Sequence, residues 1–338
     1  MMKEYLEKLL KGENLTREEA RECMDLMLSG AATPVQTAGF LIALRIKGET
    51  TDEILGCVEV MQGKGECISP NVDDYIDFVG TGGDRTNTFN ISTTSAIVAA
   101  AAGVYIAKHG NRASSSKSGS TDCFEALGVN VSLDPGRVKE CVEKVNIGYM
   151  NAQIFHKLMK NVAAVRKELG IRTIFNILGP LSNPSRAKRQ LIGVFDKNII
   201  HTYASVMMRL GVERALVVCG SDGMDEITVS GITYVSEIKD GKIIDYTIDP
   251  KDYGFEYAPE DDIKGGEPAE NAAITRNIFS GNDRGPKRDV VILNAGAAVY
   301  IGGKAESMEE GIKIARETID SGKAMAKLEE IIKFTNEI

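Results

Sequence analysis

From Tyr75 onward, short apolar runs alternate with segments that have helical patterning, and this alternation constrains the fold most strongly. Each run is four or five residues long, which suits a buried strand and is too short for a helix. Alternating strands and helices predict a mostly parallel sheet with helices on its faces. The runs are Tyr75–Val79, Val104–Ala107, Ile147–Met150, Leu191–Val194 and Ala215–Cys219. The intervening helices are expected at Ser92–Ala102, Asp122–Leu127, a segment opened by Asp134-Pro135, and Ile199–Leu210.

The second half of the chain adds a hairpin, a further strand and a final helix to this expectation. Asp240-Gly241 separates Thr233–Ile238 from Lys242–Ile248, and this dipeptide between two strand-like runs is typical of a β-hairpin at a sheet edge. The apolar run Val290–Leu293 predicts a last strand, and the charged segment Ser307–Thr335 predicts one long helix.

The first seventy residues predict helices only. Thr16 with Glu19, and Thr50 with Glu53, each form the spacing of a capping box before a helix. Thr33-Pro34 is a cap followed by proline at the first helical position. These helices indicate a compact unit whose apolar face either packs within the chain or joins subunits. The segment Phe155–Pro184 also has helical patterning, and we expect it to pack against this unit.

Composition narrows the functional classes. At about 150 residues per domain, 338 residues predict roughly two domains. A net charge of −8 argues against non-specific nucleic-acid binding, which usually needs a basic surface. The six cysteines form no C-x-x-C pair, and no apolar run reaches the roughly 20 residues of a membrane helix. The opening residues lack the pattern of a signal peptide. We therefore expect a cytoplasmic protein that binds no nucleic acid and no membrane.

A glycine-rich segment, Gly80-Thr81-Gly82-Gly83-Asp84, follows the first predicted strand directly. Glycines at a strand end allow positive φ angles and close approach of the backbone to a ligand. Asn90–Thr93 then leads into a helix, whose free N–H groups favour phosphate. The alternative is a tight turn followed by an ordinary helix cap. The loop matches neither the dinucleotide-binding pattern nor the P-loop.

A second polar segment, Lys108–Ser120, ends the next predicted strand. It contains Lys108, His109 and Arg112, followed by a run of serines. Open α/β sheets bind ligands at the carboxyl ends of their strands, and lysine and arginine there suit phosphate oxygens. A solvated serine loop is the alternative.

Two further segments carry groups of possible chemical use. Asp222-Gly223-Met224-Asp225-Glu226 offers neighbouring carboxylates, which suit magnesium together with substrate phosphate oxygens, although such a loop is often only a solvated turn. Arg166, on a predicted helix, is either a surface charge or a fork for a carboxylate substrate. His156 precedes it and has the pattern of a structural histidine.

Taken together, these segments resemble the anthranilate phosphoribosyltransferase family in order and spacing. The resemblance covers nearly the whole chain. It implies a small N-terminal α-helical domain and a larger α/β domain with a mostly parallel central sheet, of the nucleoside phosphorylase and phosphoribosyltransferase type. The matching stretches are GTGGD at 80–84, TFNIST at 88–93, KHGNR at 108–112, SGS at 118–120, EALG at 125–128, the Arg166 helix, NILGPLSNP at 176–184 and DGMDE at 222–226.

The resemblance also implies an activity and a domain division. The reaction would join anthranilate to phosphoribosyl pyrophosphate (PRPP), giving N-(5-phosphoribosyl)anthranilate and pyrophosphate, a step of L-tryptophan biosynthesis. The enzyme would be a homodimer with two Mg²⁺ ions per subunit. Residues 1–70, joined in space by roughly 155–184, would form the helical domain and residues 71–338 the α/β domain. A nucleoside phosphorylase-like enzyme and a non-enzymatic nucleic-acid-binding relative are the alternatives.

The family's binding residues carry over to three sets of positions, with no residue assigned as an acid or base. PRPP would contact Gly80, Gly83, Asp84, Thr88, Asn90, Ile91, Ser92, Thr93, Lys108, His109, Gly110, Asn111, Arg112, Ala113, Ser114, Ser115, Ser116 and Ser120. Anthranilate would contact Gly80, Asn111, Arg166, His156 and Pro180. Magnesium would be held by Ser92, Asp225 and Glu226.

Overall fold

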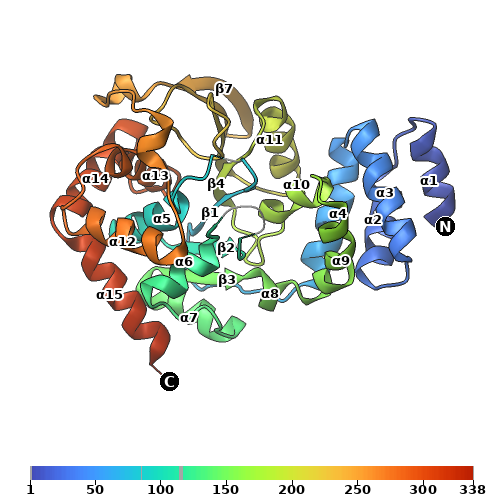
Figure 1. Ribbon diagram of the computed structural model, residues 1–338, viewed down its shortest axis with the longest axis horizontal. Coiled ribbons are helices and arrows are strands. Elements are labelled where there is room, and N and C mark those ends of the chain that lie inside the picture. Colours follow the sequence, from blue (N-terminus) through green and yellow to red (C-terminus); the bar gives the residue numbers. More distant parts are fainter. Residues whose placement is uncertain (1, 85, 114–116, 338) are drawn as a thin grey trace.

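A bundle of helices stands beside a layered α/β unit in the computed structural model, which describes residues 2–84, 86–113 and 117–337 (Figure 1). The expected combination of a helical part with a larger α/β part is confirmed. The bundle begins with α1 (Met2–Leu10), α2 (Arg17–Leu28), α3 (Pro34–Lys47) and α4 (Thr51–Lys64). Capping boxes at Thr16, Thr33 and Thr50 start three of these helices, because each threonine side chain accepts from the N–H of the third helical residue.

The α/β unit is built on one seven-stranded sheet in the order β3-β2-β1-β4-β5-β6-β7. The strands from β3 to β5 run parallel, whereas β6 and β7 pair antiparallel and close the edge as the predicted hairpin. The strands are β1 (Ile76–Gly80), β2 (Ile106–Gly110), β3 (Ile147–Asn151), β4 (Arg189–Gly193), β5 (Arg214–Gly220), β6 (Thr233–Lys239) and β7 (Lys242–Ile248).

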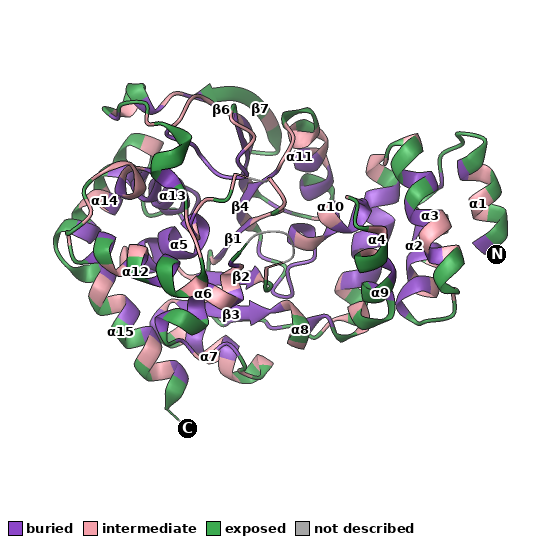
Figure 2. Ribbon diagram, viewed as in Figure 1, coloured by how far each residue is buried: buried purple, intermediate pink, exposed green. Residues whose placement is uncertain are grey.

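Both faces of the sheet are buried from β3 to β6, whereas β7 at the edge is largely exposed. Successive residues of each strand point to opposite sides. Phe78 and Leu191 belong to the core on one face, which the central helices α5 (Ile91–Ala101) and α13 (Pro286–Ile301) cover. Val79 and Ile192 belong to the core on the other face, where α11 (Ile200–Arg209) packs between the sheet and α4. Buried residues therefore concentrate in strands β1 to β6 and in α5 and α13, while β7 is largely exposed (Figure 2).

Short helices connect the strands and complete the bundle. Helices α9 and α10 pack against α2, α3 and α4, so a segment from the middle of the chain adjoins the N-terminal helices (Figure 1). No described helix is both long and apolar enough to cross a membrane. The connecting helices are α6 (Ser120–Leu127), α7 (Pro135–Val145), α8 (Ala152–Phe155), α9 (Lys160–Leu169) and α10 (Ile174–Leu181), with one-turn 3₁₀ helices at Lys157–Met159, Lys197–Ile199, Pro250–Tyr253 and Glu260–Ile263.

Two predictions of secondary structure are wrong. The run Val290–Leu293 is not a strand but part of α13, a helix buried on all sides that therefore lacks the polar face by which helices are recognised. The charged segment Ser307–Thr335 is not one helix but two, α14 (Met308–Asp320) and α15 (Lys323–Asn336), because Gly322 adopts a positive φ between them. Helix α12 (Pro268–Phe279) was not predicted at all.

Candidate active site

A cavity of about 600 Å³ opens where the carboxyl ends of β1 and β2 face helices α9 and α10. It joins residues from segments that lie far apart in the sequence and brings together most of the predicted site. The predicted residues that line it are Gly80, Gly83, Asp84, Thr88, Asn90, Ser92, His109, Gly110, Asn111, Arg112, Ala113, Ser120, His156, Arg166, Pro180, Asp225 and Glu226. Ser114, Ser115 and Ser116 lie outside the described residues.

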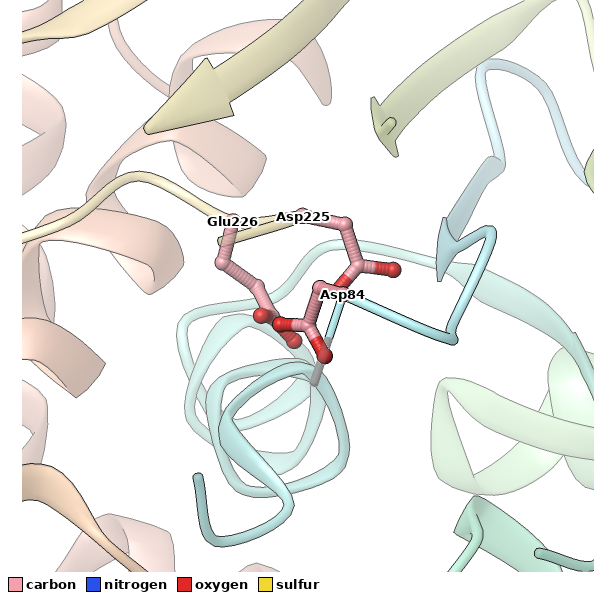
Figure 3. Close-up of side chains that lie close together, drawn as sticks. All are labelled: Asp84, Asp225 and Glu226. Carbon is pink, nitrogen blue, oxygen red and sulfur yellow. The ribbon is translucent and has the colours of Figure 1, made fainter. Parts of the chain in front are cut away.

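Three carboxylates converge at one end of the cavity (Figure 3). One oxygen from each of Asp84, Asp225 and Glu226 lies within 4.8 Å of the other two. Asp225 and Glu226 are buried, and burial followed by the charge of Asp84 raises the pKa of Asp225 to about 7. Burial and the charge of Asp225 likewise raise the pKa of Glu226. Within the described chain, Glu226 Oε2 has no hydrogen-bond donor. These buried acids repel one another, and a hard cation such as Mg²⁺ fits them.

Two strand-end glycines position this acidic cluster. Gly80 and Gly193 are paired neighbours at the ends of β1 and β4. A Cβ atom would lie 2.3 Å from Asp225 Oδ2 at Gly80 and 1.4 Å from the Asp225 carbonyl oxygen at Gly193, so no side chain fits at either place. The N–H of Gly82 also donates to Asp225 Oδ2 at 2.6 Å. The close approach at Gly80 is to the acidic loop of the protein itself, and the approach of this backbone to a ligand stays a prediction.

Helix α5 presents its N-terminus to the cavity. Its N-cap residue, Asn90, makes no capping hydrogen bond, because its side chain is engaged elsewhere. Asn90 Nδ2 donates to the Ser118 carbonyl at 3.1 Å, and Asn90 Oδ1 accepts from Ser118 Oγ and from Asn271 Nδ2, each at 2.9 Å. The amide thus ties the helix start to the β2–α6 loop and to α12. Ser92 in the first turn lines the cavity, beside N–H groups and a positive helix end that favour an anion.

Lys108, Ile91 and Thr93 are fully buried behind the cavity wall. Lys108 Nζ donates to the Phe78 carbonyl and to Ser92 Oγ, the latter at 3.3 Å. Burial lowers the pKa of Lys108 to about 8, against the opposing influence of Asp77 and Glu226. The structure therefore places this lysine as a buried contact of Ser92, and not as a charge that projects into the cavity.

Arg112 is already paired with acidic side chains of α6. Its guanidinium donates to both carboxylate oxygens of Glu125, at 2.6 and 2.7 Å, and to Asp122 Oδ1 at 2.8 Å. The sequence predicts that the Arg112 guanidinium binds phosphate. In the structure, two carboxylates already accept hydrogen bonds from this guanidinium.

The opposite end of the cavity is suited to an aromatic acid. Arg166 of α9 lies over the ring of Phe175, 4.9 Å from its centroid, and burial lowers its pKa. Among the described residues no carboxylate pairs with Arg166, and burial is the one influence that shifts its pKa. The rings of His109 and His156 meet edge to face at 5.1 Å, and burial lowers the pKa of each, so both are neutral near pH 7.

Sequence reasoning missed several contributors to the site. It assigned Asp84 to PRPP and not to the carboxylate cluster, because nothing in the sequence places residue 84 beside residues 225 and 226. Phe175 and Met61, which line the cavity from α10 and α4, have the pattern of ordinary core residues. Asn271 reaches the site from α12, a helix that was not predicted. Phe175, Met61 and Asn271 have no recognisable local signal.

The two parts of the chain match two domains of known proteins. Residues 3–65 match the helical bundle domain of a glycosyl transferase family, and residues 72–325 match the a/b domain of a glycosyl transferase family. These matches agree with the helical and α/β parts described above. Together with the strand-end cavity, they define the class of the protein as a two-domain glycosyl transferase.

Comparison with individual proteins narrows this class. The chain is 57% identical, over 99% of its length and 97% of the other's, to an anthranilate phosphoribosyltransferase of Acetivibrio thermocellus. Its sequence is 42% identical to that of the Thermus thermophilus enzyme of that name. The crystal structure of that enzyme superposes with a TM-score of 0.93, and the comparison covers 98% of this chain and 99% of the other. The Saccharomyces cerevisiae enzyme in complex with PRPP and Mg is 29% identical, with a TM-score of 0.91 over 100% and 98%. The chain belongs to the anthranilate phosphoribosyltransferase family.

Proposed function

We propose that the protein transfers the phosphoribosyl group of PRPP to the amine of anthranilate, giving N-(5-phosphoribosyl)anthranilate and pyrophosphate. The observation that carries this proposal is that one cavity has two chemically different ends. A carboxylate cluster and a helix N-terminus at one end suit a metal-bound diphosphate. At the other end, the unpaired guanidinium of Arg166 beside Phe175 and the two histidine rings suits a planar aromatic carboxylate.

The chemistry needs positioning more than proton transfer. The bond that breaks joins ribose C1 to a pyrophosphate oxygen, so positive charge develops on the sugar and negative charge on the leaving group. The N–H groups at the start of α5 would stabilise the leaving group. The nucleophile is an aromatic amine that is neutral at pH 7, so it needs no strong base to attack C1. Arg166 would bind the anthranilate carboxylate and aim the amine at that carbon.

The residue assignments of the family form part of this proposal. PRPP would lie along the two strand-end loops, against the positions named in the sequence analysis, and anthranilate would contact Gly80, Asn111, Arg166, His156 and Pro180. Ser92, Asp225 and Glu226 would hold magnesium, which neutralises the pyrophosphate charge when it is bound. The position of Asp84 beside Asp225 and Glu226 supports its inclusion in this set, and two ions per subunit remain part of the proposal.

We also propose a homodimer formed through the helical part. Leu10, Val35 and Ile46 are large apolar side chains on α1 and α3 that are about four-fifths exposed, at 78%, 83% and 82%, and a partner subunit would cover them. The contacts of α9 and α10 with α2–α4 support a domain of residues 1–70 joined by roughly 155–184, with residues 71–338 as the second domain. The described free cysteines, mostly buried, are compatible with a cytoplasmic setting.

The two alternatives have less support. A nucleoside phosphorylase-like enzyme would use inorganic phosphate and should not need the buried carboxylate cluster as a metal site. A nucleic-acid-binding relative should show a basic surface and a degraded acidic motif, whereas this chain carries a net charge of −8 and retains Asp225 and Glu226.

Anthranilate fluorescence tests the proposal directly. The fluorescence should fall when the protein, PRPP and magnesium are mixed, and it should stay constant when any one of them is omitted. Nicotinate and other aromatic acids in place of anthranilate serve as controls for the acceptor. No loss of anthranilate across a range of magnesium concentrations and pH values would refute the activity.

A further inference from the structure

A single carboxylate joins the two limbs of the β2–α6 loop. Asp122, in the first turn of α6, accepts from the Ala113 N–H and from the Gly119 N–H through the same oxygen, Oδ2, each at 2.9 Å. Its other oxygen accepts from the Arg112 guanidinium at 2.8 Å. The side chain is only 16% exposed, which strengthens these charge-assisted hydrogen bonds. Asp122 thus ties residues 112 and 113, where the loop leaves β2, to residue 119, where it enters α6.

The backbone at this crossing is closely packed. A Cβ atom on Gly119 would lie 2.4 Å from the Ala113 nitrogen and 2.6 Å from the Asn111 carbonyl oxygen, so only glycine fits. The Thr121 N–H also donates to the Asn111 carbonyl at 3.3 Å. Residues 111–113 and residue 119 are therefore in direct contact, and Asp122 links them. We call this contact the loop crossing.

Both limbs of the loop crossing line the cavity. Asn111, Arg112 and Ala113 line the cavity from one limb, and Ser118, Gly119 and Ser120 line it from the other. Asp122 itself does not line the cavity. Its carboxylate is satisfied by the loop and by Arg112, so its effect on a ligand must pass through the position of these backbone groups.

We propose that Asp122 is a positioning residue that holds the two limbs of the β2–α6 loop in register for the phosphate groups of PRPP. This inference rests on the proposed function, because the ligand of the loop is PRPP there. Glu125 assists by pairing with both ends of the Arg112 guanidinium, so that Arg112 braces the loop against α6. The positions of residues 112, 113 and 119 thus depend on an aspartate that does not line the cavity.

The test compares Asp122→Ala with Asp134→Ala. Asp134 is a matched control, because it lies at the start of a helix as the N-cap of α7 and, like Asp122, accepts two backbone N–H groups, from Gly136 at 2.9 Å and Arg137 at 3.2 Å. Both variants lose a helix-capping aspartate, so both should unfold at a lower temperature. Only Asp122→Ala should raise the Kd and KM for PRPP, by roughly tenfold or more, while the KM for anthranilate, which Asn111 of the same loop would also contact, should rise less.

Asp122→Asn keeps the inference testable if the alanine variant does not fold. An amide can accept both backbone N–H groups through its oxygen, but its NH₂ group then faces Arg112, so we expect an intermediate rise in the KM for PRPP.

Titration calorimetry with PRPP and magnesium separates this inference from the proposed function. A wild-type protein that leaves anthranilate unconsumed refutes the function. A wild-type protein that binds PRPP no better than Asp122→Ala does, or equal rises in KM for both substrates, refutes the role of Asp122.

Discussion

Replacing Arg166 with alanine should weaken the capture of anthranilate and leave the binding of PRPP unchanged. The guanidinium lies over the Phe175 ring at 4.9 Å and lines the cavity. In the described part of the chain it has no carboxylate partner, although burial already opposes its charge and lowers its pKa. A group that is desolvated and unpaired in the free protein gains most when an anion arrives.

The size of the effect follows from the number and type of hydrogen bonds lost. Arginine binds a carboxylate through two parallel N–H donors, and hydrogen bonds to charged groups contribute about 1.5–3 kcal/mol. Losing that stabilisation corresponds to a rise of about 10- to 150-fold in the KM for anthranilate. The turnover number at saturating anthranilate should fall less, because the guanidinium binds a group remote from the reacting amine.

Fluorescence-monitored kinetics at varied anthranilate and fixed, saturating PRPP measures this effect. Arg316→Ala is the matched control, since Arg316 also lies over a phenylalanine ring, Phe255, at 5.1 Å, but not in the cavity. It should leave both KM values unchanged. An unchanged KM for anthranilate in Arg166→Ala, or an equal rise in Arg316→Ala, would refute the assignment of Arg166.

Three further predictions concern the acidic end of the cavity. Asp225→Asn combined with Glu226→Gln should abolish turnover while the protein still unfolds cooperatively, and wild-type rates at limiting magnesium would exclude their metal role. Gly193→Ala places a Cβ 1.4 Å from the Asp225 carbonyl, so thermal unfolding should show a loss of about 1–3 kcal/mol and turnover should need more magnesium, whereas Gly63→Ala, with nothing within 4 Å, should do neither. In metal-free buffer, stability should fall as pH rises from about 4, the unfolded pKa of an aspartate, to the folded pKa of about 7 for Asp225, because folding disfavours the ionised form. Magnesium should therefore raise the unfolding temperature more at pH 8 than at pH 5, and an equal effect at both values would contradict the burial of these acids.

Local signals predicted most of the fold. The capping boxes at Thr16 and Thr50 fixed two helix starts, and the apolar runs at β1 and β5 lie within a residue or so of the observed strands. The two failures have different physical causes. Helix α13 is buried on all sides, so its sequence carries apolar content without the period that separates helix from strand. The break between α14 and α15 depends on one left-handed glycine, Gly322, within a charged stretch that otherwise favours a helix.

The candidate site was predictable only where its residues follow strand ends. Residues 80–84 and 108–113 begin in the last residues of β1 and β2, and residues 222–226 follow β5. Parallel strands bring their carboxyl ends to one edge of the sheet. The contacts between these segments have no local signal in the sequence. Asp84 meets Asp225, and Asn271 meets Asn90, across more than a hundred residues, and only the folded chain sets these pairs.

The acidic cluster shows how small residues at strand ends can organise charged groups elsewhere. Asp225 is buried with its carbonyl against Gly193 and its carboxylate against Gly80, where any other side chain would collide with it. The N–H of Gly82 offsets part of the cost of burying that carboxylate. Burial in turn is what makes the cluster repulsive without a cation and therefore receptive to one. Gly80, Gly82 and Gly193 thus position Asp225, and the geometry of the acidic part of the cavity is set by where the strand ends lack side chains.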